Sequence, residues 1–407
     1  MLSSVILKSV ILMNNRQLFL QHIAQTSSTP IGIEMVKAEG IYLYDVNGKK
    51  YMDAIAGFSV ANIGHSNEKV IEAVKQQAEQ YMHLIVYGEF IQQPQVAYAK
   101  LLTDNLPSTL NCVYFTNSGT EATEGAMKLA KRITNRSKII AFNKSYHGST
   151  QGALSVMGDE YWRNAYRPLL PDIYHFDFNS EEAINAIDEN TACIIMEIVQ
   201  AEAGIIQPNK NWLQRIRKKC NDVCALVIAD EIQSGFGRTG TLFAFEQYGI
   251  VPDILLLGKA LGGGMPLGAF IADKKLMNAL TNNPVLGHIT TFGGHPVSCA
   301  AGKAALEFLV KGNFINIVKE KEVILQEQLQ HKKIRAVRTG GLWAAVEFDS
   351  FETNHAVIQK CIANGVITDW FLFAANCLRV APPLTITNEE LITLCAVIKQ
   401  SIDEVLN

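Results

Sequence analysis

Two short apolar runs, each delivering one ionisable residue, constrain the fold of this chain more than any other feature of its sequence. The first run covers residues 225–230 and ends in Asp230, and the second covers 254–257 and stands just before Lys259. Runs this short and this apolar are typical of strands that are buried on both faces of a parallel sheet. Open α/β sheets bind ligands at the carboxyl ends of their strands, so the sequence predicts that Asp230 and Lys259 face a common site.

A lysine and an aspartate at one sheet edge suit the chemistry of pyridoxal phosphate. A lysine amine forms an imine with the aldehyde of this cofactor, and a carboxylate can face its pyridine nitrogen. Lys259 and Asp230 are therefore the predicted catalytic residues, and pyridoxal 5′-phosphate is the predicted cofactor.

Further short apolar runs alternate with helical patterns along most of the chain, which is typical of βαβ units and a mostly parallel sheet. The segment around Asn47-Gly48 differs, because an Asn-Gly pair between alternating runs indicates a hairpin. We predict a large α/β domain over residues 66–300 and a smaller α+β domain built from both chain ends, 1–65 and 301–407. The predicted strands are 112–115, 138–142, 193–197, 225–230, 253–258 and 269–272, and the predicted helices are 68–81, 121–133, 212–221 and 302–309.

Two loops at the ends of predicted strands are candidates for cofactor contacts. Segment 117–122 (NSGTEA) opens a helix, where hydroxyls and free N–H groups can bind phosphate with the help of the helix dipole. A helix cap without a ligand is the alternative. Tyr146 can stack on a planar cofactor, with an ordinary loop tyrosine as its alternative, and for His147 we expect supporting packing or hydrogen bonding.

Two other motifs have competing interpretations. The GxGxxG pattern at 235–240 follows a strand, but no clear apolar-striped helix follows it and no acidic strand end lies about 20 residues on. We therefore interpret it as a flexible loop and not as a dinucleotide site. Arg379 stands just before a Pro-Pro turn and can bind a carboxylate through two hydrogen bonds, with a structural ion pair as the alternative.

Composition excludes several classes of function. A formal net charge of −3 leaves no basic footprint for nucleic acid. Eight cysteines without a CxxC pair indicate free thiols in the cytoplasm and no zinc or other metal site. No run approaches the ~20 apolar residues of a membrane span. Residues 1–13 are apolar but interrupted by Lys8, so we expect a packed or partly disordered segment there and no signal peptide.

Segments 229–240 (ADEIQSGFGRTG) and 259–264 (KALGGG) resemble the class III, or omega, family of pyridoxal-phosphate aminotransferases, and acetylornithine- and ornithine-type enzymes are among the similar members. The similarity covers about residues 30–400. It implies fold type I architecture and a homodimer with shared active sites. It also implies a small-molecule amino donor and a 2-oxo acid as substrates.

The resemblance further implies a role for each matching residue. Lys259 matches the lysine of the internal aldimine, Asp230 the aspartate that pairs with the pyridinium, and Gln233 the glutamine near the ring hydroxyl. Arg379 matches the position that binds the substrate α-carboxylate, and Glu202 the position that pairs with this arginine when a donor lacks that group. The remaining matches place Ser118, Gly119 and Thr120 at the phosphate, Tyr146 on the ring, His147, Glu197 and Ile232 in the cofactor site, and Thr291 at the phosphate of the neighbouring subunit.

The chain departs from the acetylornithine- and ornithine-type pattern at two substrate-binding positions. Ser149 stands where these relatives usually have an arginine, and Phe58 stands where ornithine enzymes have a tyrosine. Both polar groups would contact a substrate carboxylate, so glutamate/2-oxoglutarate and ornithine-like pairs are in doubt. Arg163 or Arg167 could replace the missing arginine.

We therefore expect a pyridoxal-phosphate-dependent aminotransferase that moves an amino group from an amino acid or omega-amine to a 2-oxo acid through a Lys259 aldimine. An aminomutase or racemase on the same scaffold and a catalytically silent homologue stay open as alternatives. Arg379 argues against the first if it binds an oxo acid. The presence of Lys259 and Asp230 argues against the second.

Overall fold

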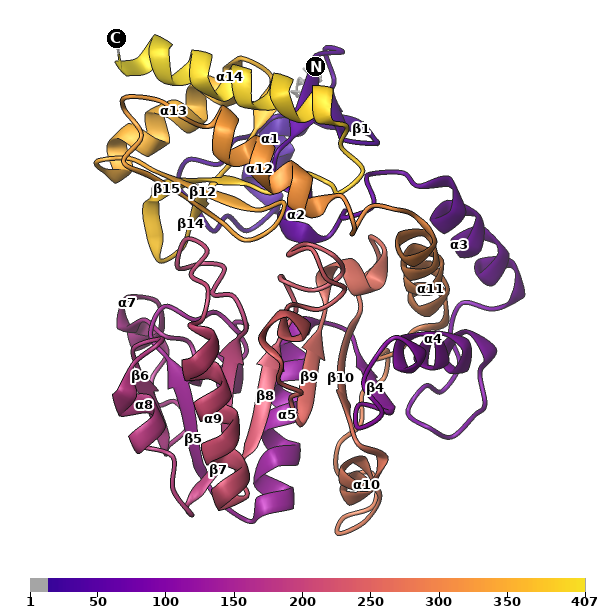
Figure 1. The fold of residues 1–407 in the computed structure, drawn as a ribbon. Helices are drawn as coiled ribbons and strands as arrows, with labels where there is room; N and C mark the ends of the chain where they lie inside the picture. Colours follow the sequence, from indigo (N-terminus) through magenta and orange to yellow (C-terminus); the bar gives the residue numbers. More distant parts are fainter. Residues whose placement is uncertain (1–13, 407) are drawn as a thin grey trace, which may run out of the picture.

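The computed structural model describes residues 14–406, which form three β-sheets. Figure 1 shows the central seven-stranded sheet in the lower half of the molecule and the two four-stranded sheets above it, with the C-terminal helices at the top. The expected packed or partly disordered segment at residues 1–13 lies outside the described residues.

The central sheet has the strand order β4-β10-β9-β8-β7-β5-β6. Neighbouring strands from β6 to β9 are parallel, whereas β10 is antiparallel to both β9 and β4. The predicted mostly parallel α/β sheet is therefore confirmed. The strands are β4 (Cys112–Thr116), β5 (Lys138–Phe142), β6 (Ile173–Phe176), β7 (Thr191–Glu197), β8 (Leu226–Asp230), β9 (Ile254–Leu257) and β10 (Gly268–Ala272).

Helices cover both faces of this sheet, which explains why its strands are almost continuously apolar. In β7, Ile194 and Met196 belong to the core cluster that includes α9 (Lys210–Val223). Cys193 and Ile195 belong to the opposite cluster, which includes α5 (Gly119–Thr134). Full burial of one such aliphatic side chain contributes roughly 1.5–3 kcal/mol. The two helices thus fix the sheet whose carboxyl edge carries Asp230.

Both ends of the chain contribute to the smaller sheets. In the sheet β1-β2-β3-β13, Val366 pairs in parallel with Met52, and the predicted hairpin around Asn47-Gly48 joins β2 to β3. The proposed domain limits at 65/66 and 300/301 remain a prediction. The strands are β1 (Met35–Glu39), β2 (Tyr42–Asp45), β3 (Lys50–Asp53) and β13 (Val366–Ile367), and in the other sheet β11 (Ala336–Thr339), β12 (Ala344–Glu347), β14 (Trp370–Phe371) and β15 (Ala374–Val380).

The predicted helices are all present, with shifted ends. Helix α11 begins six residues before the predicted 302–309, at Pro296, because proline is well suited to the first turn of a helix. The prediction missed β6, a short strand at the sheet edge. The helices are α1 (Asn15–His22), α2 (Ala56–Ser59), α3 (Glu68–Gln80), α4 (Gln93–Asp104), α5, α6 (Gln151–Ser155), α7 (Glu160–Arg163), α8 (Glu181–Asn185), α9, α10 (Lys274–Met277), α11 (Pro296–Lys311), α12 (Val318–Gln328), α13 (Phe351–Ala363) and α14 (Asn388–Leu406), with 3-10 turns η1 (Asn164–Tyr166), η2 (Ala244–Tyr248), η3 (Lys259–Gly262) and η4 (Asn278–Thr281).

The GxGxxG segment at 235–240 forms a loop, as predicted, but the prediction that it is flexible does not fit its packing. Arg238 is fully buried and donates hydrogen bonds to the carbonyls of Leu342 and Pro382 and to the side-chain oxygen of Asn62. Its guanidinium therefore ties the central sheet to segments from both ends of the chain.

Across residues 14–406, no helix combines the length and apolar character needed to cross a membrane. The same residues contain no group of three or more His, Cys, Asp or Glu side chains placed to hold a metal ion.

Candidate active site

The carboxyl edge of the central sheet carries a cavity of about 280 Å³. Glu197 and Asp230 are directly paired at the ends of β7 and β8, and the turn after β9 brings Lys259 to the same cavity. The lining residues are Gly119, Thr120, Tyr146, His147, Gly148, Ser149, Glu197, Val199, Asp230, Ile232, Gln233, Ser234 and Lys259. Most of the predicted cofactor residues therefore meet at one place.

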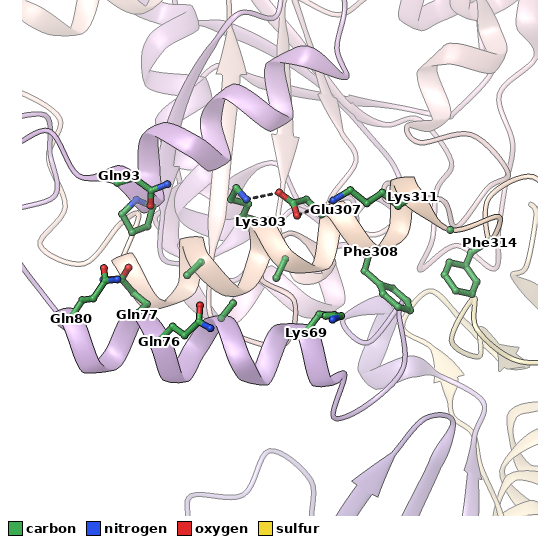
Figure 2. A pocket seen from close by; sticks show the side chains of 15 residues that line it. Lys69, Gln76, Gln77, Gln80, Gln93, Lys303, Glu307, Phe308, Lys311 and Phe314 are labelled. Atoms are coloured by element: carbon green, nitrogen blue, oxygen red, sulfur yellow. Dashed lines mark hydrogen bonds and ion pairs between the residues drawn. The ribbon is translucent and has the colours of Figure 1, made fainter.

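A larger groove, of about 630 Å³, lies between α3 and α11 (Figure 2). Glutamines and lysines line much of it, and Lys303 and Lys311 both pair with Glu307. None of the residues that the sequence assigns to the cofactor lines this groove. The smaller cavity around Lys259 is therefore the candidate site.

Lys259 is held in a conformation that few lysines adopt. Its φ is +49°, in the left-handed region, which is unfavourable for a residue with a side chain and is found mostly where the surroundings impose it. Its Nζ donates a hydrogen bond to Gln233 Oε1 at 2.8 Å. Burial lowers the pKa of Lys259, although the Glu202 carboxylate opposes the shift. A lowered pKa increases the share of neutral amine, which is the form that attacks a carbonyl carbon.

Asp230 is held on both carboxylate oxygens. Its Oδ1 accepts a hydrogen bond from the backbone N–H of Ile232 at 2.9 Å, and its Oδ2 lies 2.7 Å from Nδ1 of His147. His147 is buried, and its Nε2 has no hydrogen-bond partner among the described residues. The expected supporting role of His147 therefore fits this contact with Asp230.

Glu197 is a second buried carboxylate beside Asp230. Its Oε1 accepts from the backbone N–H of Tyr146 at 2.9 Å, and its Oε2 accepts from that of Ala201 at 2.8 Å. Burial raises the pKa of Glu197 to about 7, against the opposing effect of His147. The Glu197 carboxylate thus accepts hydrogen bonds from two backbone N–H groups in different loops.

The N-terminus of α5 opens into the cavity and can hold a phosphate. Thr120 lines the cavity, and its Oγ1 lies 2.7 Å from Oγ1 of Thr150. Ser118 does not line it, because its hydroxyl caps the helix by accepting from the N–H of Glu121. The backbone of Gly148 lies so close to Thr120 that a Cβ on residue 148 would be 2.2 Å from Thr120 Oγ1. Backbone and hydroxyl groups are therefore exposed to a ligand at a helix N-terminus, as anion binding requires.

The described residues fit pyridoxal phosphate. Gln233 Nε2 is buried and has no hydrogen-bond partner within residues 14–406, so it is an unused donor close to Lys259. A Cβ on Gly119 would lie 2.7 Å from Ile232 Cδ1, so only glycine leaves this side of the cavity as it is. An amine, a carboxylate, an unused donor and a phosphate cradle around one space match the functional groups of this cofactor.

Arg379 and Glu202 form an ion pair close to Lys259 but do not line its cavity. The Arg379 guanidinium donates to both carboxylate oxygens of Glu202 at 2.8–3.0 Å and packs on the rings of Phe371 and Phe58, at 4.2 and 5.2 Å. Burial alone would raise the pKa of Glu202, but the charge of Arg379 and its hydrogen bonds lower it. Phe58 lies in a left-handed stretch, with φ +60°. The structure therefore brings together the three predicted substrate-binding residues.

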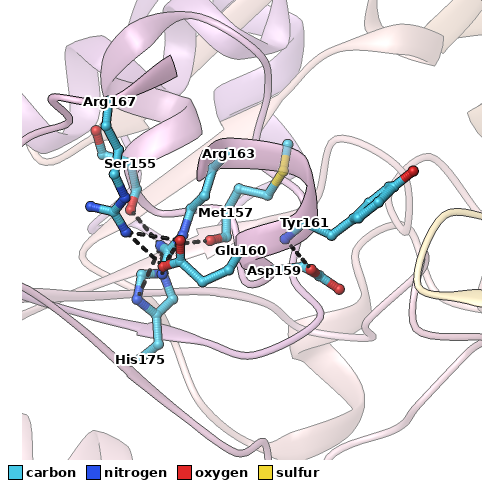
Figure 3. A network of polar contacts seen from close by, with 8 residues as sticks. All are labelled: Ser155, Met157, Asp159, Glu160, Tyr161, Arg163, Arg167 and His175. Atoms are coloured by element: carbon cyan, nitrogen blue, oxygen red, sulfur yellow. Dashed lines mark hydrogen bonds and ion pairs between the residues drawn. The ribbon is translucent and has the colours of Figure 1, made fainter. Parts of the chain in front are cut away.

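Arg163 and Arg167 are engaged elsewhere (Figure 3). Both donate to the carboxylate of Glu160, and Arg163 also donates to the carbonyls of Ser155 and Met157. Arg163 further contacts the ring of His175, whose pKa burial lowers to about 4. Neither arginine lines the cavity, whereas Ser149 does, beside the Tyr146 hydroxyl at 3.1 Å. Relatives usually have an arginine at the position of Ser149. The described residues that line the cavity include no arginine that could replace it.

Thr291 is exposed and does not line the cavity of its own chain. Its neighbour Thr290 accepts a hydrogen bond from the Asn117 side chain, next to the phosphate cradle. The sequence did not single out Val199, which lines the cavity two residues after Glu197. Continuing the strand alternation past the end of β7 would have placed these two side chains on the same face.

Comparison with known proteins gives one family. The family model described as "Aminotransferase class-III" matches residues 23–402. An acetylornithine aminotransferase from Caldanaerobacter subterraneus is 36% identical over 88% of this chain and 92% of its own length. A putrescine aminotransferase from Pectobacterium atrosepticum is 37% identical over 89% and 80%. The ornithine aminotransferase of Toxoplasma gondii, whose structure has partial occupancy of PLP at its active site, superposes with a TM-score of 0.88 at 29% identity over 95% of this chain and 93% of that one.

The match over nearly the whole chain agrees with a site that fits pyridoxal phosphate, and with the fold type I architecture implied by the sequence. Amino donors and 2-oxo acids are the substrates of such enzymes. This chain belongs to the class III aminotransferases and is a pyridoxal-phosphate-dependent transaminase.

Proposed function

We propose that this transaminase takes the amino group of an ω-amino compound and passes it to a small monocarboxylic 2-oxo acid. One observation carries the proposal: among the described residues that line the cavity, Lys259 is the only lysine or arginine. Arg379 lies outside this lining and is paired with Glu202. A substrate can therefore place one carboxylate on Arg379 and finds no second arginine for another.

Pyridoxal phosphate supplies an aldehyde that bonds to amines and a ring that accepts electrons. In the proposed mechanism, Lys259 would hold the cofactor, and its Nζ would move the proton at the carbon next to the donor nitrogen. Gln233 orients this Nζ through their 2.8 Å hydrogen bond. Asp230 would favour a protonated nitrogen on the cofactor ring, and His147 holds Asp230 in place.

The Glu202–Arg379 pair adapts the site to its two kinds of substrate. A donor without a carboxylate beside its amine leaves the pair closed, so that neither buried charge lacks a partner. A 2-oxo acid offers a carboxylate that can replace Glu202 on the planar guanidinium. The putrescine aminotransferase at 37% identity supports a donor of the first kind.

A half-reaction tests this function. The holoenzyme is mixed with a diamine or ω-amino acid and no acceptor, and the absorbance of the bound cofactor is followed. We expect conversion to the pyridoxamine form, and its reversal on addition of pyruvate. An aminomutase or racemase would return its product without pyruvate, and a silent homologue would show no conversion.

We predict that pyruvate serves at least as well as 2-oxoglutarate as the acceptor. Hydrogen bonds to a charged group contribute roughly 1.5–3 kcal/mol, or about one to two decades in specificity, and the described lining of the cavity offers no arginine to a distal carboxylate. The measurement is kcat/KM for both acceptors with one common donor. Arg163→Gln and Arg167→Gln are the controls. A strong preference for 2-oxoglutarate that either change removes would show that one of these arginines reaches the substrate.

We further propose that the enzyme is a homodimer and acts in the cytoplasm. An exposed apolar surface supports the dimer, because large apolar patches mark interfaces. Two segments form it and touch where the rings of His83 and Phe292 lie 4.7 Å apart. Eight free cysteines support a reducing compartment. The exposed apolar residues of the patch are Met82, Leu84, Ile85, Phe90, Ile91, Val96, Val285, Leu286, Ile289 and Phe292.

Thr291 lies within this surface, and we predict that it acts on the cofactor phosphate of the partner. Thr291→Ala should lower activity about tenfold or more through loss of a hydrogen bond to a charged group. Mixing these chains with inactive Lys259→Ala chains should restore about a quarter of wild-type activity, because half of randomly formed dimers are hybrids with one intact site. Thr290→Ala, which alters a contact within one chain, is the control. Mixtures no more active than their parents would show that Thr291 does not act across the interface.

A further inference from the structure

Glu197 holds two separate loops of the active site with one carboxylate. Its Oε1 accepts from the N–H of Tyr146, and its Oε2 accepts from the N–H of Ala201. Glu197 is buried at the end of β7 and forms no ion pair with another described side chain. Each carboxylate oxygen is thus used to fix a different piece of backbone.

The two loops carry different parts of the chemistry. The first presents Tyr146 and His147 to the cavity, and His147 contacts Asp230. The second continues from Ala201 directly into Glu202, the partner of Arg379. Glu202 is also anchored from the other side, because its Oε2 accepts from the N–H of Leu372. Glu197 therefore links the wall of the cofactor cavity to the residue that occupies the substrate-carboxylate position.

We propose that Glu197 is a positioning residue that sets how readily Glu202 releases Arg379, and so tunes the enzyme between substrates with and without a carboxylate beside the reacting carbon. The proposal rests on the proposed function of the Glu202–Arg379 pair. A loosened Ala201 loop would let Glu202 move away more easily. A carboxylate ligand should then reach Arg379 more readily.

Two substitutions distinguish the effect of the Glu197 hydrogen bonds from the effect of its negative charge. Glu197→Asp keeps the negative charge, but its side chain is one carbon shorter and cannot reach both N–H groups. Glu197→Gln keeps the length, but one of its two terminal atoms is a donor and cannot accept from an N–H. Glu197→Asp therefore weakens both hydrogen bonds, the one from Ala201 included, whereas Glu197→Gln removes one of the two, and only Glu197→Gln removes the charge.

The experiment measures the dissociation constant of propionate for the holoenzyme, followed by the absorbance of the bound cofactor. Propionate has the carboxylate but no amine or carbonyl, so the measurement does not depend on turnover. We expect both variants to bind propionate about tenfold more tightly. This is the change that corresponds to loss of one hydrogen bond to a charged group, here the bond from the Ala201 N–H to Glu197 that restrains Glu202. Glu246→Gln is the matched control, because Glu246 also accepts from a backbone N–H, that of Phe243, outside the cavity. It should bind propionate as the wild type does.

The pH dependence of the cofactor absorbance gives a second readout. Burial lowers the pKa of Lys259 and the Glu197 anion opposes this shift, so Glu197→Gln should shift the titration of the bound cofactor to lower pH, and Glu197→Asp should leave it close to wild type. The titratable side chains that face Glu197 are His147 from the loop after β5 and Asp230 from β8, besides Lys259. All three are unchanged in both variants.

Wild-type propionate affinity should itself depend on pH. Burial raises the pKa of Glu197 to about 7, so as pH falls through this value one carboxyl oxygen becomes protonated and accepts poorly. Propionate should therefore bind more tightly to the wild type as pH falls through 7, and this step should be absent in Glu197→Gln.

The inference is overturned if both variants bind propionate within twofold of the wild type. Failure of the proposed donor and acceptor assignment would look different, because it would appear as a wild type that prefers other substrates while propionate affinity still responds to Glu197.

Discussion

Replacing Lys259 by alanine is expected to abolish transamination, lowering kcat by about four decades or more. Positioned proton transfer alone contributes about 10²–10⁴-fold, and loss of the amine also removes covalent attachment of the cofactor. The variant should fold and should still bind the cofactor through the phosphate cradle at α5. The measurement is kcat with saturating donor, together with the visible absorbance of the bound cofactor.

Borohydride reduction provides the direct check on Lys259. Reduction of the wild-type holoenzyme, followed by peptide mass mapping, should place the pyridoxyl group on the peptide that contains Lys259. Lys321 is an internal control, because it is also buried and burial lowers its pKa to about 8, but it donates to the carbonyl of Leu384, away from the cavity. Label on Lys321 or any other lysine would mean that the assignment of Lys259 is wrong.

Asp230→Asn is expected to leave the fold and the covalent bond to Lys259 intact but to slow proton transfer by about two decades or more. The amide cannot stabilise a protonated ring nitrogen, and loss of such an ion pair in a buried site raises the barrier by several kcal/mol, at about 1.36 kcal/mol per decade. The single-turnover rate with an amine donor measures this step, because it isolates chemistry from product release.

Asp253→Asn is the control for Asp230→Asn. Asp253 also supports β8, since it accepts from the N–H of Val227 and pairs with Arg217, but it lies at the other end of that strand. A general loosening of β8 would slow both variants. An unchanged single-turnover rate in Asp230→Asn, with a full complement of cofactor, would refute the role assigned to this carboxylate.

The sequence was sufficient to predict where the central chemistry lies. The apolar runs before Asp230 and Lys259 must be buried on both faces, and parallel strands bring their carboxyl ends to one edge. This reasoning needs only local patterns and topology. It therefore placed both residues beside one cavity without any knowledge of how the loops fold.

The contacts of the loops were predicted less well. Arg163 and Arg167 were candidates for substrate binding, but Glu160, from the same short segment, holds both. The i,i+3 spacing of Glu160 and Arg163 was a local signal for this contact, and it was overlooked. Glu197 accepts its hydrogen bonds from the backbone N–H groups of Ala201 and Tyr146. Every non-proline residue has such a group, so the sequence does not reveal which ones bind. The left-handed conformations of Lys259 and Phe58 likewise follow from surrounding packing and not from residue type.

The pairing of Val366 with Met52 has a consequence for the synthesis of the protein. The β1–β3 segment leaves the ribosome early, but the strand that completes its sheet, β13, is made only near the end of translation. Until then the outer edge of β3 has no partner, and an open strand edge can pair with other chains. We therefore expect this sheet to close after translation is nearly complete, with the nascent chain depending on chaperones to keep β3 from pairing with other chains.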